Sequence, residues 1–254
     1  MSIILEAEHL TKVFTTKGKE VLKAVDDVSF QLKAGEILGI VGESGCGKST
    51  LAKLITRLTD LTSGTLIFNG KDITNLSGRE LKHFYGKIQM VFQNPLTSFD
   101  PRRTLGDGIG ESLRNRGMKK EERNRRITEV LEQAGLSAEF ADRYPHEVSG
   151  GQCQRAAIAR ALAVEPAILI CDEATSALDV TIQKQIMDLL QELKEKQGLS
   201  FIFICHKLAL VQMFCDRVLV LYDGKVVESG TTDEIINHPK EEYTKKLIES
   251  ACES

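Results

Sequence analysis

Short, mainly apolar runs recur along this chain of 254 residues and alternate with stretches of helical periodicity. Each run is about five residues long and is bounded by turn-forming or charged residues, which is typical of a buried strand. The clearest runs lie at residues 37–41, 88–92, 167–171 and 201–205. Strands that alternate with helical segments in this way predict an α/β chain.

Further strands are expected near the N-terminus and beside two tight turns. Polar and apolar residues alternate partly over residues 4–10 and again over residues 28–32, which predicts strands rather than helices in the first forty residues. The strand-like run 65–68 is followed by Asn69-Gly70, and the run 218–222 is followed by Asp223-Gly224. Both dipeptides favour tight turns, so we expect a β-hairpin at each of them.

Helices are predicted where apolar residues recur at every third or fourth position. From about Leu105 to Tyr144 the chain has this character, with a dense charge run at residues 118–126 that we interpret as a solvated helix face. The stretch predicts a helical insertion within the α/β chain. Helices are also expected over residues 51–55 and 155–163, from Asp179 to Gly198, and in the polar tail from Thr231.

The composition is that of an ordinary globular protein, with 42% hydrophobic and 27% charged residues. A net charge of −3 argues against a protein that binds nucleic acid mainly through the phosphates, which would be basic. No apolar run approaches the roughly 20 residues that a membrane helix needs. The six cysteines have no C-x-x-C spacing, so we expect free thiols in a reducing compartment and a cytosolic chain.

The strand at 37–41 leads into the sequence GESGCGKST, which matches the phosphate-binding P-loop pattern G-x-x-x-x-G-K-[ST]. Its glycines permit backbone conformations closed to other residues and bring N–H groups close to phosphate oxygens. Lys48 supplies a positive charge for the β- and γ-phosphates, and the Ser49 hydroxyl suits Mg²⁺. We therefore expect a nucleoside triphosphate to bind at Gly42, Glu43, Ser44, Gly45, Cys46, Gly47, Lys48, Ser49 and Thr50.

Three later strands end in polar residues that could act on such a nucleotide. The run 167–171 ends in Asp172-Glu173, the Walker B arrangement, in which the aspartate serves Mg²⁺ and the second carboxylate is placed to act on water. Gln93 follows another strand at a loop junction, where it could reach Mg²⁺ and the attacking water, although most glutamines are simply solvated. His206 follows the run 201–205, and a structural histidine is the alternative there.

Two more features have a function only if a partner or an adenine base is present. Ser149, Gly150, Gly151 and Gln152 precede a helix and form a second anion-ready N-terminus, for which a chain with one nucleotide has no evident use. Phe14 is a lone aromatic that could stack on an adenine base or lie in the core as a strand residue. Spacing alone favours the core.

In their order along the chain, these motifs resemble those of the ATP-binding subunits of ABC transporters. The set is the P-loop, Gln93, the SGGQ segment at 149–152, Asp172-Glu173, residues 176–179 and His206. The resemblance covers nearly the whole chain. It implies a P-loop NTPase with a mainly parallel core sheet, an antiparallel β subdomain and an inserted α-helical subdomain. The core and the β subdomain would be residues 1–92 and 160–254, and the helical subdomain with the signature motif would be about 93–159.

The resemblance also explains the second anion site, because in that family two ATPase domains pair head to tail. Each ATP then lies between the P-loop of one subunit and the SGGQ segment of the other. Phe14 falls where the family has its adenine-stacking aromatic, which reverses the preference from spacing. The resemblance implies that Lys48 binds phosphate and that Ser49, Gln93 and Asp172 bind Mg²⁺, with Gln93 also at the coupling interface. It further implies that Glu173 is the general base and that His206 contacts the γ-phosphate.

Some positions depart from the family pattern. Val148 replaces the usual leucine of the signature, and Cys153 follows SGGQ where arginine or glutamine is commoner. Cys205-His206-Lys207 replaces Ser-His-Asp, which affects the hydrogen bonding expected around His206. A helix N-terminus lowers the pKa of a thiol, so we expect a reactive thiolate at Cys46. We expect Cys153 to face the ATP of a partner, with burial in its own subunit as the alternative.

Within the family, the sequence FQNPLTSFDPR at 92–102 resembles the peptide and nickel importer group, as do RYPHE at 143–147 and SALDV at 176–180. The resemblance implies an ATP-hydrolysing motor at the cytoplasmic face of the cell membrane. Its partners would be a second ABC ATPase subunit, two transmembrane permease subunits and, indirectly, an extracytoplasmic substrate-binding protein, with no nucleic acid.

The alternatives are a soluble ABC-type ATPase in DNA repair or translation, and a small GTPase or kinase. The first is disfavoured because no heptads separate Lys48 from Ser149 and the chain has one cassette. The second is disfavoured because no Asn-Lys-x-Asp guanine motif occurs.

Overall fold

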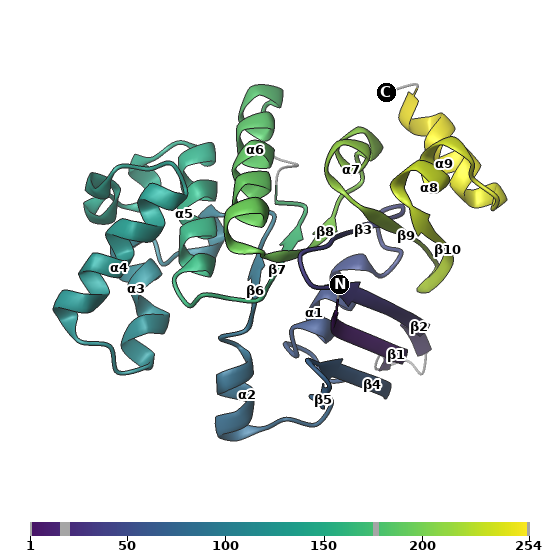
Figure 1. Ribbon diagram of the computed structural model, residues 1–254, viewed down its shortest axis with the longest axis horizontal. Coiled ribbons are helices and arrows are strands. Elements are labelled where there is room, and N and C mark those ends of the chain that lie inside the picture. Colours follow the sequence, from purple (N-terminus) through teal and green to yellow (C-terminus); the bar gives the residue numbers. More distant parts are fainter. Residues whose placement is uncertain (1, 16–20, 175–177, 253–254) are drawn as a thin grey trace. The chain divides into compact units, whose positions relative to one another are not determined.

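The computed structural model describes residues 2–15, 21–174 and 178–252. The chain forms two compact units, one made of residues 1–82 and 198–254 and the other of residues 83–197 (Figure 1). Within the described residues, no helix is long and apolar enough to span a membrane.

The first unit contains an antiparallel sheet with the strand order β2-β1-β4-β5 (Figure 1). Its strands are β1 (Ile3–Thr15), β2 (Val21–Lys33), β4 (Ser63–Phe68) and β5 (Lys71–Asp72). Between β4 and β5, Asn69 and Gly70 have φ angles of 49° and 74°. Two successive residues with positive φ are what a tight hairpin turn of this kind requires, so the predicted hairpin is confirmed.

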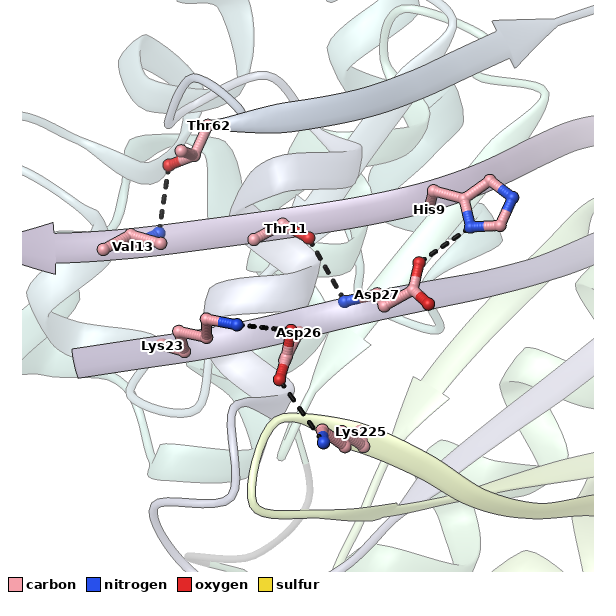
Figure 2. Close-up of polar contacts among 8 residues, drawn as sticks. All are labelled: His9, Thr11, Val13, Lys23, Asp26, Asp27, Thr62 and Lys225. Carbon is pink, nitrogen blue, oxygen red and sulfur yellow. Dashed lines mark hydrogen bonds and ion pairs between the residues drawn. The ribbon is translucent and has the colours of Figure 1, made fainter. Parts of the chain in front are cut away.

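β1 and β2 are longer than the partial alternation in the sequence predicted. Their pairing changes register several times along this length. His9 and Asp27 lie at such irregular points, with φ angles of 53° and 58°. Side chains supply part of the pairing there: His9 Nδ1 lies 2.7 Å from Asp27 Oδ1, and the Asp27 N–H donates to Thr11 Oγ1 at 3.2 Å (Figure 2). The bulges interrupt the period of two, which explains why the sequence alternates only partly.

The same unit contains a second set of strands in the order β10-β9-β3-β8. They are β3 (Ile37–Val41), β8 (Ser200–Ile204), β9 (Arg217–Tyr222) and β10 (Lys225–Thr231). β3 pairs in parallel with β8 and β9, whereas β10 is antiparallel to β9 across the predicted hairpin. Every residue of β3 and β8 is buried, as expected for apolar runs in a parallel sheet.

The helices of this unit follow its strands. They are α1 (Lys48–Ile55), α7 (Leu208–Phe214), α8 (Thr232–Asn237) and α9 (Glu242–Cys252), and the chain passes to the second unit within α2 (Gly78–Phe84). The helix after the P-loop and the helical tail are confirmed. α2 and α7 were not predicted from the sequence, because seven residues make only about two turns and too few periodic positions.

The second unit contains the parallel pair β6 (Ile88–Val91) and β7 (Ile168–Asp172) and a set of helices. The main helices are α3 (Leu105–Asn115), α4 (Lys120–Gln133), α5 (Gly150–Leu162) and α6 (Val180–Gln197). Short 3₁₀ turns lie at Leu96–Ser98, Ala138–Asp142 and Pro145–Glu147. The helical insertion predicted between Leu105 and Tyr144 is therefore confirmed.

One side chain in the charge run at 118–126 does more than face solvent. Most of the run is exposed, as predicted, but the side chain of Arg126 is only 17% exposed. Its guanidinium donates to the carbonyls of Leu162 at 3.0 Å and Ala163 at 3.3 Å. The guanidinium supplies hydrogen bonds to the last carbonyls of α5, and its charge interacts favourably with the negative end of the helix dipole. The interpretation of the run as a wholly solvated face was wrong for this residue.

Gly39 provides the stability prediction for the first unit. A Cβ atom at Gly39 would lie 2.9 Å from Cys215 Sγ and 3.2 Å from Val211 Cγ1, so the absence of a side chain lets α7 and the residue after it pack onto β3. We predict that Gly39→Ala lowers the free energy of unfolding by about 1–3 kcal/mol through overpacking. A urea titration of the wild type and the variant measures this.

A second substitution separates overpacking from other causes. In the Gly39→Ala background, Cys215→Ala removes the closest atom and should cost less than it does in the wild type. Equal urea midpoints for Gly39→Ala and the wild type would contradict this packing.

Candidate functional site

The P-loop takes a shape that only glycine permits at its bends. Gly42, Gly45 and Gly47 have φ angles of 150°, 84° and 108°. A Cβ at Gly42 would lie 2.2 Å from the carbonyl oxygen of Leu221, and a Cβ at Gly47 would lie 2.2 Å from that of Ala24. The loop is thus pressed against backbone at the end of β9 and near the start of β2. These two glycines serve the packing of the chain itself as well as any approach to phosphate.

A chain of backbone hydrogen bonds joins the loop to the rest of its unit. The Gly224 N–H donates to the Cys46 carbonyl at 3.0 Å, and the Asp26 N–H donates to the Gly224 carbonyl at 2.8 Å. The Asp26 carboxylate also lies 3.2 Å from Lys23 Nζ and 3.5 Å from Lys225 Nζ (Figure 2). The hydrogen bond from Lys23 holds the pKa of Asp26 below its usual value. We call this connection from Asp26 through Gly224 to Cys46 the backbone strap.

Lys48 is enclosed by the loop that it belongs to. Its side chain is buried, and Nζ donates to the Gly42 carbonyl at 2.8 Å and to the Glu43 carbonyl at 2.7 Å. A buried ammonium group needs such acceptors, because an unpaired charge in the interior is costly. The carbonyls hold the cation at the centre of the loop, where phosphate oxygens would be stronger acceptors. The arrangement therefore fits an anionic ligand.

The same unit places His206 and Phe14. His206 follows the carboxyl end of β8, beside the end of β3 from which the P-loop starts, because the parallel register pairs Ile40 with Ile204. Its side chain is exposed, and beside it the Lys207 N–H donates to Cys205 Sγ at 3.2 Å. In this chain, the sulfur therefore takes a backbone hydrogen bond at the position where the family has serine. Phe14 is 41% exposed near the end of β1, so the alternative that it lies in the core is wrong.

The second unit brings Gln93, Asp172 and Glu173 to one edge. β6 and β7 are parallel and pair Val91 with Cys171, so all three polar residues follow or end neighbouring strands at their carboxyl ends. Gln93 is exposed and Asp172 is buried. Glu173 has a φ angle of 49°, which costs a residue with a side chain about 1–2 kcal/mol. His9, Asp27 and Asn69 share this conformation at bulges and at a turn, so the angle alone assigns no role to Glu173.

The SGGQ segment forms the N-terminus of α5. Ser149 is the N-cap: its Oγ accepts from the Gln152 N–H at 3.3 Å, and Gln152 Oε1 accepts from the Ser149 N–H at 2.9 Å. This reciprocal capping box fixes the start of the helix. Ser149 and Gly150 are exposed, whereas Gly151 is buried. Ile182 packs so closely on Gly151 that an added Cβ would lie 2.7 Å from Ile182 Cγ2. The segment therefore presents its first two residues to solvent.

Arg160 was not found from the sequence, whereas Asp179 stands where a helix was predicted to begin. Arg160 of α5 donates to the Ser98 carbonyl and lies over the Phe99 ring, 4.5 Å from its centroid. It ties the segment after Gln93 to the helix that follows SGGQ. Asp179 caps α6, because its Oδ1 accepts from the Ile182 N–H at 2.9 Å. An Asp three residues before an apolar helical residue signals such a cap, whereas no local signal marks Arg160. Ser176 and Ala177 lie outside the described residues.

The expectation of a reactive thiolate at Cys46 is wrong. Cys46 is only 8% exposed, and its burial raises the pKa of the thiol despite the nearby Lys48. Cys153 is fully buried, and burial raises its pKa to about 11. The structure therefore supports the alternative that Cys153 is covered by its own subunit. Desolvation penalises the thiolate more than the helix N-terminus or the lysine stabilises it.

Comparisons with known proteins identify the family of the chain. Residues 25–176 match the family described as ABC transporter, and the match contains the P-loop, Gln93, SGGQ and Asp172-Glu173. The chain belongs to the ABC transporter family. As a member of this family, it binds and hydrolyses ATP, and its fold is that of an ABC ATPase.

Its relatives cover nearly all of the chain. It is 48% identical to the oligopeptide transport ATP-binding protein OppF of Bacillus subtilis (strain 168), over 96% of this chain and 81% of the relative. It is 42% identical to the dipeptide transport ATP-binding protein DppF of Lactococcus lactis subsp. cremoris (strain MG1363), over 97% of this chain and 80% of the relative. A solved dimeric ATP-binding cassette, MJ0796 bound to ADP and phosphate, matches with a TM-score of 0.82 and 34% identity, over 90% of this chain and 99% of that chain.

The close contacts of the P-loop predict unequal effects of its glycines on stability. Gly47→Ala adds a Cβ against the Ala24 carbonyl at a φ of 108° and should lower the free energy of unfolding, without nucleotide, by about 2–5 kcal/mol. Gly45→Ala is the matched control, because nothing lies within 4 Å of its Cβ, and strain alone should cost about 1–2 kcal/mol. Equal losses for the two variants in chemical denaturation would contradict the packing of the loop.

The buried thiols predict how stability depends on pH. The pKa values of Cys153 and Cys171 rise from 9.0 to about 11 and about 12, so the folded state disfavours their thiolates. Their contribution is complete below pH 9 and is lost as the pH rises toward 11 for Cys153 and toward 12 for Cys171, by about 1 kcal/mol per pH unit for each thiol. Urea midpoints measured between pH 8 and 10.5 should fall less steeply for Cys153→Ala than for the wild type. Fast alkylation of Cys153 in the native protein at neutral pH would contradict its burial.

Proposed function

We propose that this chain is the ATP-hydrolysing motor subunit of a membrane importer for peptides. The observation that carries the proposal is its similarity to peptide-transport ATP-binding proteins over at least 96% of the chain. The fold adds a P-loop that is already shaped around a buried lysine. A role in DNA repair or translation lacks any comparable observation. Nickel remains a second cargo to test, because it is suggested by sequence motifs alone.

In this proposal each motif has a separate role toward the nucleotide. Lys48 would leave the carbonyls of its own loop for the β- and γ-phosphates, which are stronger acceptors. Phe14, exposed near the end of β1, would offer its ring to the adenine base. The oxygen atoms of Ser49, Gln93 and Asp172 are of the kind that Mg²⁺ prefers, and the ion would neutralise charge on the phosphates.

Hydrolysis would then be carried by three residues that follow the ends of parallel strands. Glu173 would accept the proton of the attacking water, while Gln93 orients that water. His206 would donate a hydrogen bond to the γ-phosphate, on which charge develops as the bond to the leaving oxygen breaks. The assignment of Glu173 is supported by its place directly after Asp172, at the carboxyl end of β7.

The exposed start of α5 would serve a second subunit. Ser149 and Gly150 face solvent at a capped helix N-terminus, which attracts anions through its N–H groups and dipole. Head-to-tail pairing of two ATPase subunits would bring this end to the γ-phosphate bound by the partner. ATP binding would close the pair and hydrolysis would reopen it, at the cytoplasmic face of two transmembrane permease subunits. An extracytoplasmic protein would deliver the cargo.

Replacement of Glu173 by Gln tests the catalytic assignment. We predict that Glu173→Gln keeps ATP binding but lowers the hydrolysis rate by roughly 10²–10⁴, because the amide cannot accept the proton. The variant should also accumulate an ATP-bound pair, which size-exclusion chromatography with light scattering measures. Lys48→Ala is the contrasting variant: it removes a charged donor from the phosphates and should weaken ATP binding by roughly 10–100-fold.

These two variants decide between the proposed site and other sites. Unchanged turnover in Glu173→Gln would refute its role as general base. Unchanged affinity in Lys48→Ala, measured by direct titration, would refute the P-loop as the nucleotide site. Reconstitution with the permease subunits and a screen of short peptides against nickel salts for stimulated ATPase activity would then identify the cargo class.

A further inference from the structure

The C-terminal helix contacts the P-loop through a residue from the far end of the sequence. The Glu43 N–H donates to the Tyr243 hydroxyl at 3.0 Å, although the two residues are 200 positions apart. Both residues belong to the first unit. The Tyr243 ring lies against that of Tyr222 at the end of β9, with 4.3 Å between the ring centroids. The hydroxyl therefore comes to the loop on a side chain whose ring is held in place.

The position of Tyr243 is fixed by a carboxylate that precedes it in the chain. Glu228 of β10 accepts from the Lys240 N–H at 2.8 Å and from the Glu241 N–H at 3.2 Å, immediately before α9 begins. A carboxylate on these otherwise unpaired N–H groups stabilises the start of a helix. Tyr243 is the second residue of α9, so Glu228 and Tyr222 together set where its hydroxyl lies.

Tyr243 and Lys48 hold opposite ends of the same peptide group. The carbonyl of this group belongs to Gly42 and accepts from Lys48 Nζ at 2.8 Å, while its N–H belongs to Glu43 and donates to Tyr243. If Lys48 turns to phosphate when a nucleotide binds, the carbonyl loses its partner. The Tyr243 hydroxyl is then the group that keeps the first peptide of the loop in place. Burial raises the pKa of this hydroxyl, and its oxygen accepts the hydrogen bond through a lone pair.

We propose that Tyr243 is a positioning residue for nucleotide binding, which holds the first turn of the P-loop through the Glu43 N–H when Lys48 engages phosphate. Tyr243 does not touch the reacting atoms in this proposal, and it acts through the loop backbone. The inference rests on the proposed function, since it takes the P-loop as the ATP site. It adds that α9 belongs to the structure that supports this site.

The test is Tyr243→Phe, which removes the hydroxyl and keeps the ring. We expect the full-length variant to bind ATP roughly two- to tenfold more weakly, the range that corresponds to the loss of one net hydrogen bond. Tyr222→Phe is the matched control, because it makes the same change in the neighbouring ring and should leave the affinity within about twofold. Direct titration with ATP and Mg²⁺ measures the affinities, and thermal unfolding without nucleotide measures stability.

A second variant separates positioning from a general loss of stability. Glu228→Gln should loosen the start of α9 and weaken ATP binding because Tyr243 is then held less firmly. The double variant Glu228→Gln with Tyr243→Phe should therefore bind ATP no more weakly than whichever single variant has the lower affinity. Independent structural damage would instead multiply the two effects.

The outcomes also separate this inference from the proposed site. If Lys48→Ala weakens ATP binding and Tyr243→Phe does not, the inference is wrong and the site stands. If neither variant changes the affinity, the P-loop assignment itself is wrong.

Discussion

The structure of the site depends on how closely the P-loop approaches the backbone of its own unit. Gly42 and Gly47 leave no room for a Cβ against the carbonyls of Leu221 and Ala24. The backbone strap then joins the Cys46 carbonyl to β2 through Gly224. Three segments that are distant in the sequence therefore define one loop. Neighbouring backbone already holds the bend of the P-loop. The loop therefore loses less conformational entropy when a ligand binds.

A buried cation is the second constraint, and it follows from the first. The curled loop turns the carbonyls of Gly42 and Glu43 toward Lys48, which gives the ammonium group acceptors in a place that water does not reach freely. These carbonyls stabilise the buried charge, and a phosphate oxygen would be a stronger acceptor for it. The thiols respond in the opposite way, because burial disfavours their charged form and so raises the pKa of Cys46 beside the same lysine.

Motifs and strand ends could be predicted from the sequence, because their signals are local. The P-loop, the pair Asp172-Glu173 and the hairpin at Asn69 each depend on residues that lie within a few positions of one another. Long-range contacts could not be predicted in this way. Arg160 and Tyr243 act on backbone groups 62 and 200 positions away, and their own neighbours in the sequence give no sign of it. The charge state of Cys153 also depends on burial, which spacing does not report.

The close contacts of Gly42 and Gly47 and the backbone strap predict that the P-loop keeps its bend both with and without nucleotide. Amide hydrogen exchange at Gly224 and Asp26 in the nucleotide-free protein tests it most directly, because their N–H groups form the backbone strap. A preformed loop predicts that both amides are strongly protected without ATP, and that saturating ATP changes their exchange only slightly. Exchange of both amides at the rate of an unfolded peptide, followed by protection only after ATP is added, would contradict the account.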